Sequence, residues 1–257
     1  MSFINYATKT IAIKIVYYGP GLSGKTTNVR YIHYKLDSAY RGDLVCLETD
    51  TERTYFFDLL PIRAGMIGDF KVHFQLMTVP GQVFYEASRK SVLKGADGII
   101  FVADSQIPLL DANLENFDGL RRNCLQHDID LMKVPLVFQY NKRDLNFLIP
   151  VETFNNLLNP RRCPSIEAVA VTGVGVFETL REISKLTVPI VREKLFGERP
   201  REEPAEGQMS ERDLDGLREK GPEEGGEAPG PVSKVKIKSR KDIEDELDKL
   251  SKEFAGK

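Results

Sequence analysis

The segment Gly19-Pro-Gly-Leu-Ser-Gly-Lys-Thr26 carries the most specific chemical signal in the sequence. It matches the phosphate-binding pattern GxxxxGK[ST], and it lies between an apolar run and a helical pattern. The glycines allow successive backbone N–H groups to surround phosphate oxygens, the lysine adds a cation, and the helix N-terminus favours an anion. The alternative is a glycine-rich turn before a helix. The residues expected around the phosphates are Gly19, Gly21, Leu22, Ser23, Gly24, Lys25, Thr26 and Thr27.

A second polar motif, Asn141 to Asp144 (NKRD), directly follows the apolar run PLVFQY. A carboxylate at Asp144 can accept hydrogen bonds from the two N–H donors on the Watson–Crick edge of guanine, whereas adenine presents an unprotonated ring nitrogen there. An unpaired buried group costs about 1–3 kcal/mol, which is enough to select the base. Asn141, Lys142 and Asp144 are therefore expected to bind guanine. An ATPase or small-molecule kinase, the competing interpretation, predicts that ATP competes with bound GDP.

The elements that position these motifs alternate along the chain. Apolar runs that predict strands occupy Ile11 to Tyr18, Leu44 to Leu47, Val72 to Val79, Gly98 to Ala103, Pro135 to Tyr140 and Ile166 to Val171. Helical patterns follow the first phosphate motif through Leu36 and occupy Leu109 to Leu125, Val151 to Leu158 and Phe177 to Leu195. This alternation predicts an α/β fold, a doubly wound and mostly parallel sheet with helices on both faces. Ligands of such folds bind at the C-terminal ends of the strands.

The composition changes after Gly197, and this divides the chain into three parts. Residues 1–197 are predicted to form the nucleotide-binding domain. Residues 198–238 are rich in Glu, Pro and Gly and end in a basic run, which predicts a disordered acidic linker. Residues 239–257 carry Ile243, Leu247, Leu250 and Phe254 at helical spacing. That last segment is interpreted as either a solvated, partly helical tail or a partner-binding helix.

Charge and hydropathy exclude several classes of protein. The formal net charge of -2 argues against a broad basic field that binds nucleic acid. The N-terminus lacks the pattern of a secretory signal, no apolar run is long enough to span a bilayer, and neither end carries a lipidation motif. We therefore expect a cytoplasmic protein.

The phosphate motif, a switch segment, a PGQ and an NKxD, in this order, resemble the Ras-type small GTPases over about residues 10–195. Four segments resemble, in sequence, GTPases of the bacterial gliding-motility MglA type. They are YYGPGLSGKTTN, ERTYFFD, TVPGQVFYEASRK and QYNKRDL. This resemblance implies GTP and GDP as ligands, Mg²⁺ as cofactor and GTP hydrolysis as activity. It also implies a monomeric nucleotide-binding domain. The partners that it implies are a Roadblock-domain activator of hydrolysis and polarity or motility effectors, which recruit the protein to a cell pole or membrane surface.

The resemblance also assigns individual residues. Thr26 and Thr54 are expected to bind Mg²⁺, and Arg53 is expected to act as an arginine finger within the same chain, although a solvated loop arginine is the alternative. Gln82, with Gly81 before it, matches the glutamine that orients the attacking water, and Lys25 completes the expected catalytic set. Ala170 matches a residue whose backbone N–H reaches the guanine oxygen.

One position departs from the Ras pattern. Where Ras-type chains place an aspartate at the start of the second switch, this chain has Thr78. The change puts Mg²⁺ affinity in question and leaves two hypotheses. The chain is either a GTPase switch controlling cell polarity or gliding motility, or a nucleotide-loaded scaffold with little hydrolysis whose tail recruits partners.

Overall fold

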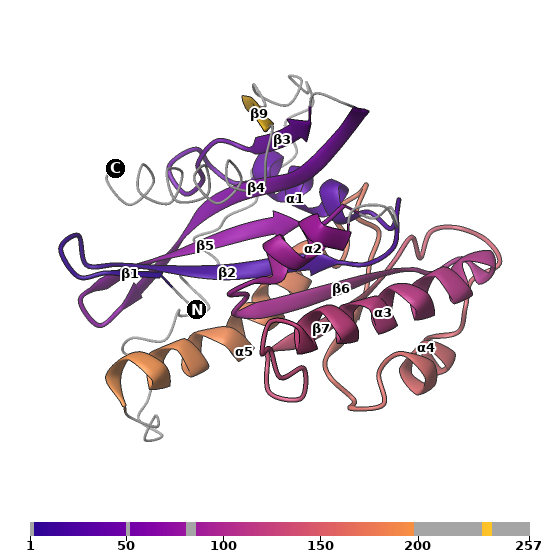
Figure 1. Cartoon of the computed structure of the whole chain (residues 1–257). Helices are drawn as coiled ribbons and strands as arrows, with labels where there is room; N and C mark the ends of the chain where they lie inside the picture. Colours follow the sequence, from indigo (N-terminus) through magenta and orange to yellow (C-terminus); the bar gives the residue numbers. More distant parts are fainter. Residues whose placement is uncertain (1–2, 50–51, 81–85, 198–232, 238–257) are drawn as a thin grey trace.

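The computed structural model describes residues 3–49, 52–80, 86–197 and 233–237, which form one mixed sheet covered by helices (Figure 1). The strand order is β8-β7-β6-β2-β5-β4-β3-β9, and β1 pairs with β2. The strands are β1 (Phe3–Asn5), β2 (Thr10–Tyr18), β3 (Val45–Thr49), β4 (Glu52–Ile67), β5 (Phe70–Thr78), β6 (Gly98–Asp104), β7 (Leu136–Asn141), β8 (Ser165–Glu167) and β9 (Ser233–Ile237). The helices are α1 (Lys25–Lys35), α2 (Glu86–Leu93), α3 (Leu110–Leu125), α4 (Val151–Leu157) and α5 (Val176–Phe196), and a 3₁₀ turn, η2 (Ile107–Leu109), precedes α3.

The central part of the sheet is parallel. Strand β2 lies between β5 and β6 and pairs in parallel with both, and β6, β7 and β8 continue the parallel order. Strands β1, β3 and β4 are joined to their neighbours by antiparallel pairing, apart from the β3–β9 pair, which is parallel. The predicted fold class, a mostly parallel α/β sheet with helices on both faces, is confirmed.

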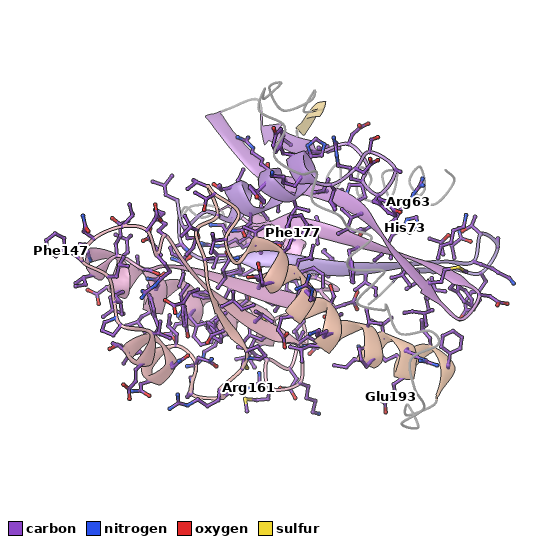
Figure 2. All side chains as sticks on the ribbon, turned by 180° about the vertical axis from the view of Figure 1, so that it is seen from behind. Arg63, His73, Phe147, Arg161, Phe177 and Glu193 are labelled. Atoms are coloured by element: carbon purple, nitrogen blue, oxygen red, sulfur yellow. The ribbon has the colours of Figure 1, made fainter. Side chains whose placement is uncertain are left out.

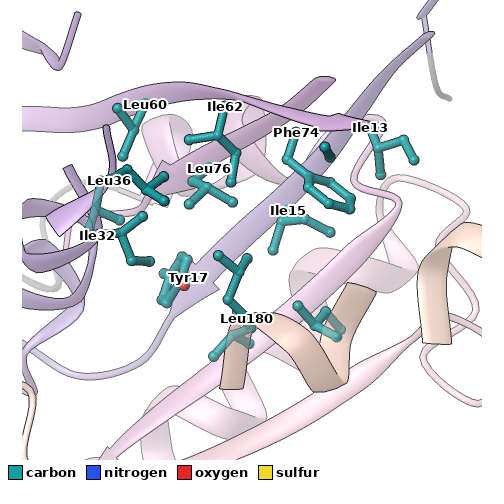
Figure 3. Packing of buried hydrophobic residues seen from close by; sticks show 14 of the residues in the cluster. Ile13, Ile15, Tyr17, Ile32, Leu36, Leu60, Ile62, Phe74, Leu76 and Leu180 are labelled. Carbon is teal, nitrogen blue, oxygen red and sulfur yellow. The ribbon is translucent and has the colours of Figure 1, made fainter. Parts of the chain in front are cut away.

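Successive side chains of β2 point to opposite faces of the sheet and so contribute to two separate parts of the hydrophobic core. Ile13, Ile15 and Tyr17 pack with α1 and α5 on one face, and Figure 3 shows them among Ile32, Leu36 and Leu180. Val16 and Tyr18 belong to the core of the other face, with side chains from α2 and α3. Because both faces of β2 are buried, its sequence reads as a nearly continuous apolar run.

Three described strands and one helix were not expected from the sequence. Strand β1 precedes the first predicted strand, β4 is long and polar at several positions, α2 is short, and β9 lies where a linker was predicted. Strand β8 is shorter than the apolar run that predicted it, ending at Glu167. Its remaining residues turn into the loop before α5.

Several predicted features lie outside the described residues. They are Gly81 and Gln82, and the proposed helix of residues 239–257. Among the residues that the structure does describe, no helix has the length and apolar character needed to cross a membrane.

Candidate nucleotide site

The loop from Gly19 to Gly24 joins the end of β2 to the start of α1. Gly19 has φ +141° and Gly24, the N-cap residue of α1, has φ +101°, values that favour glycine. A Cβ atom on Gly19 would lie 2.2 Å from the carbonyl oxygen of Val102 on β6, and one on Gly24 would lie 2.1 Å from Nδ2 of Asn141. The two glycines therefore let the loop approach β6 and the NKRD motif more closely than any other residue type.

Lys25, the first residue of α1, points back over the loop. Its Nζ donates hydrogen bonds to the carbonyl oxygens of Gly19 at 3.0 Å and Pro20 at 2.6 Å. Burial, and after it the charge of the nearby Arg89, lower the pKa of Lys25 to about 7, against the smaller opposite effect of the Asp58 carboxylate. Within the part of the chain that the structure describes, this buried lysine forms no ion pair with a carboxylate. An anion placed there would stabilise its charged form.

Thr26, the next residue of α1, contacts a carboxylate that sequence reasoning did not select. The Thr26 hydroxyl donates to Oδ2 of Asp58 on β4 at 2.7 Å. The hydroxyl of Thr78 donates to the same oxygen at 3.0 Å, and the Cys46 thiol donates to Oδ1 at 2.9 Å. Asp58 is buried, so these donors offset part of the cost of taking its charge out of water.

The NKRD motif is held by its first three residues. Lys142 forms an ion pair with Asp104 at the end of β6, with 2.6 Å between Nζ and Oδ2. Arg143 forms one with Glu167 on β8, with 2.7 Å between Nε and Oε2. Asp144 itself is exposed, and Phe147, further along the same loop, is 82% exposed (Figure 2). The motif therefore presents Asp144 to solvent from a braced loop.

Asn141 connects this motif to two other loops. Its Nδ2 donates to the carbonyl oxygen of Ser23 in the phosphate loop at 2.8 Å. Its Oδ1 accepts a hydrogen bond from the backbone N–H of Ala170 at 2.9 Å. One buried amide thus joins the expected phosphate loop, the expected base motif and the loop after β8 at the C-terminal ends of β2, β7 and β8.

Arg53 and Thr54 lie in β4, at an irregular part of its pairing with β3. The register passes from Thr49 opposite Glu52 to Glu48 opposite Tyr55, so Arg53 and Thr54 are extra residues on β4. Such bulges redirect side chains and often lie beside functional sites. This local geometry differs from the regular ladder that follows, from Leu47 opposite Phe57 to Val45 opposite Leu59.

Comparison with known proteins identifies the family. No family model matches the chain. Over 188 residues the chain is 55% identical to "Mutual gliding-motility protein MglA" of Myxococcus xanthus (strain DK1622). That match covers 73% of this chain and 96% of the relative. The chain belongs to the MglA family. The MglA family consists of small GTPases, which agrees with the resemblance of the motifs to Ras-type proteins.

The residues of this MglA-type chain fit a guanine nucleotide and Mg²⁺. The buried Ser23 hydroxyl has no hydrogen-bond partner among the described residues, and it lies in the loop where phosphate acceptors are expected. Thr26 and Asp58 supply the hard oxygen atoms that Mg²⁺ prefers, directly or through its water ligands. The donor set therefore suits a phosphate–Mg²⁺ pair at the start of α1.

Asp58 is the candidate site residue of this MglA-type chain that the sequence motifs did not indicate. One signal was present, because a lone acidic residue stands in the apolar segment YFFDLLPI. A carboxylate inside a strand of this kind is expected to be buried only when it is paired or bound to a metal. Its partners, Thr26 and Thr78, are distant in sequence, so the pairing itself became visible only in the fold.

Proposed function

We propose that the chain is a molecular switch that binds GDP and GTP with Mg²⁺, hydrolyses GTP, and controls cell polarity or gliding motility. The observation that carries this proposal is the Asn141 amide, which bonds both the Ser23 carbonyl and the Ala170 N–H. Through it the phosphate loop and the base motif become two ends of one site. Membership of the MglA family supports both the GTPase activity and the process.

In this proposal the guanine base is read by the loops around Asn141. Asp144, exposed at the surface of the braced motif, accepts hydrogen bonds from the two N–H donors of the base. The N–H of Ala170, expected to reach the guanine oxygen, is bonded here to Asn141. We propose that the N–H of Val171, one residue further along the same loop, takes that role. Asn141 would thus orient the base loop while the next amide contacts the ligand.

At the phosphate end, Lys25 leaves the carbonyl oxygens of Gly19 and Pro20 and pairs with the phosphates of the nucleotide. Thr26 and Thr54 hold Mg²⁺, and the Asp58 carboxylate supplies the negative charge that Thr78 does not. When bound, Mg²⁺ neutralises charge on the phosphate oxygens. Because Thr26 and Thr78 share one oxygen of Asp58, the first helix and the end of β5 are linked at this point.

For hydrolysis, Arg53 neutralises charge that develops on the γ-phosphate and Gln82 aligns the attacking water. Phosphoryl transfer is catalysed mainly by such positioning and charge neutralisation, and an arginine of this kind contributes about 10³–10⁵-fold in kcat. The bulge that makes Arg53 and Thr54 extra residues of β4 supports a special role for this pair. We propose that a Roadblock-domain partner fixes this segment and accelerates the reaction.

Single-turnover hydrolysis of GTP tests the proposal. We expect slow hydrolysis by the chain alone, acceleration by a Roadblock-domain protein, and loss of hydrolysis with retained GTP binding in Gln82→Leu. The nucleotide-loaded scaffold, the second hypothesis, predicts GDP and GTP binding with no acceleration under either condition. A chain that takes up neither GDP nor GTP in the presence of Mg²⁺ would contradict both.

A further inference from the structure

The segment Ser233–Ile237 lies beside the strand that would otherwise end the sheet. Strand β3 pairs with β4 on one side, and β9 pairs with its other side (Figure 1). An uncovered edge of this kind presents unpaired backbone N–H and C=O groups and can bind an extended segment of another protein. In this chain a segment from beyond the nucleotide-binding domain covers those groups.

The pairing of β9 with β3 is parallel and in continuous register. It runs from Ser233 opposite Val45 to Ile237 opposite Thr49, without a shift. The register places Val235 opposite Leu47, two apolar residue types, and Lys236 opposite Glu48, two residue types of unlike charge. The sequence SKVKI alternates polar and apolar residues with the period of a strand. The segment is therefore suited to the place it occupies.

A covalent connection makes so short a strand effective. Five residues in parallel pairing would bind weakly as a free peptide, because they must be ordered for few hydrogen bonds. Attachment to the same chain raises the effective concentration of the segment to about the millimolar range. Residues 198–232 connect α5 to β9, and a chain of this length spans on the order of 30 Å.

This chain is longer than the relative it matches. The match to the Myxococcus xanthus protein uses 96% of that protein but 73% of this chain. Most of the unmatched part of this chain therefore has no counterpart in that relative.

We propose that Ser233–Ile237 is a built-in cover of the β3 edge, which has to leave before a partner can add a strand there. The partner that fits the uncovered edge is an extended protein segment in which basic and apolar residues alternate. The cover and the partner cannot occupy the same edge together. A partner therefore binds only if its pairing with β3 is strong enough to displace the cover.

The covered edge is linked to the candidate site through one residue. Cys46 of β3 lies opposite Lys234 of β9 on one side and opposite Asp58 of β4 on the other. Its thiol donates to Asp58, whose second carboxylate oxygen accepts from Thr26. Release of the cover therefore alters the strand that supports the proposed Mg²⁺ site, a consequence that rests on the proposed function.

Hydrogen exchange of the full chain tests the cover. In a parallel pair only alternate residues donate to a given neighbour, so the double variant Val235→Pro/Lys236→Pro removes at least one donor toward β3 whichever residues they are. We expect those amides of Val45–Thr49 that face β9 to exchange about tenfold faster or more in this variant, and the amides of the same strand that face β4 to serve as an internal reference. The matched control, Glu223→Pro/Glu224→Pro, places two prolines in the connecting segment and should leave that exchange unchanged.

A binding measurement completes the test. A fluorescent peptide with the sequence of residues 231–240, PVSKVKIKSR, should bind the Val235→Pro/Lys236→Pro chain and not the parent, as followed by anisotropy up to millimolar concentration. Equal exchange of β3 in parent and variant would overturn the proposal, as would failure of the opened variant to bind the peptide. If sedimentation shows a dimer in which Ser233–Ile237 of one copy pairs with β3 of the other, the proposal that the cover acts within one chain is wrong.

GDP binding in the same samples keeps the two proposals separate. If the β3 amides exchange more slowly in the parent than in Val235→Pro/Lys236→Pro, the proposal of a cover is supported whether or not the chain retains GDP. Absence of GDP binding in the parent overturns the proposed function and leaves the exchange result standing.

Discussion

The Thr26 hydroxyl and Oδ2 of Asp58 are 2.7 Å apart, which joins the phosphate motif to a carboxylate on β4. Thr78, at the position where Ras-type chains have an aspartate, donates to the same oxygen at 3.0 Å. The negative charge that the sequence lacks at the end of β5 is therefore present at the site, supplied by a neighbouring strand. We therefore propose that Asp58 takes over the role in Mg²⁺ binding that Ras-type chains give to an aspartate at the position of Thr78.

Replacing Asp58 by Asn tests this role. The Asn amide has nearly the same shape as the carboxylate but no charge. Mg²⁺ is expected to slow GDP release, and we expect the Mg²⁺ concentration needed for this to rise by about 10–100-fold in Asp58→Asn. Loss of residues that support metal ligands typically lowers metal affinity by this factor. Release of a fluorescent GDP analogue, titrated with Mg²⁺, measures the effect. Asp111→Asn, at an exposed position of α3, is the control. An unchanged Mg²⁺ dependence in Asp58→Asn would show that the carboxylate only supports the fold.

The two left-handed glycines Gly24 and Gly197 form a matched pair for a second prediction. Gly24→Ala would force a Cβ to within 2.1 Å of the Asn141 amide, whereas Gly197, with φ +66°, has no atom within 4 Å of the same position. We expect Gly197→Ala to lower the free energy of unfolding by about 1–2 kcal/mol and to keep GDP binding. Gly24→Ala should lose more stability and bind GDP much more weakly. Urea unfolding and GDP titration measure the two effects. Equal losses in the two variants would mean that the Asn141 contact contributes nothing.

The buried lysine predicts a pH dependence of nucleotide binding. Lys25 has a pKa of about 7 without an anion, and contact with phosphate favours its charged form, so binding above pH 7 takes up a proton. The Kd for GDP should therefore rise with pH, approaching about tenfold per pH unit. Calorimetry in two buffers of different ionisation enthalpy counts the protons. Lys25→Met should bind weakly and take up no proton at this site. Uptake that persists in that variant would assign the proton to another group.

The same shift affects stability. Because the pKa of Lys25 is about 7 in the folded chain and has its ordinary value of 10.5 in the unfolded chain, the unfolded chain binds more protons between those two values. The contribution of this group to the free energy of unfolding accordingly rises with pH over that window. Bound nucleotide should remove this dependence.

Asp144 predicts selectivity for guanine. We expect Asp144→Ala to weaken GDP binding by about 10–100-fold, because the N–H donors of the base lose their acceptor. Inosine diphosphate lacks the 2-amino group and should be affected less, so the preference for GDP over inosine diphosphate should shrink. Competition against a fluorescent GDP analogue measures both, with Asp111→Ala as the control. A preference that survives the change would place base recognition elsewhere.

Sequence patterns predicted the parallel part of the fold well. Strands β2, β5, β6 and β7 are buried on both faces, so each appears as an apolar run of strand length. Strand β4 could not be predicted in this way, since Pro61 lies in its middle and charged residues interrupt it. Proline within a strand usually argues against a central position, yet Pro61 is paired with Gln75 in the register of β4 and β5. Pairing with β3 and β5 outweighs the local signal.

The candidate site was predictable where a motif is continuous in sequence. The phosphate loop and the NKRD motif could be located because each stands directly after an apolar strand. Asp58 and the contact of Asn141 with Ala170 depend on residues brought together from separate strands, which no local pattern reports. Strand β9 is similar, because SKVKI gains its regular structure only from the edge of β3.

The parallel register of β9 also decides where the rest of the chain emerges. Ile237 pairs with Thr49, at the end of β3 from which the chain continues toward Glu52 and Arg53. Ile237 thus lies at the end of β3 that leads to the proposed catalytic residue Arg53. A fluorescent protein fused directly after Ile237 would begin at that corner of the molecule, so imaging of this protein in cells is better done with a label at another position.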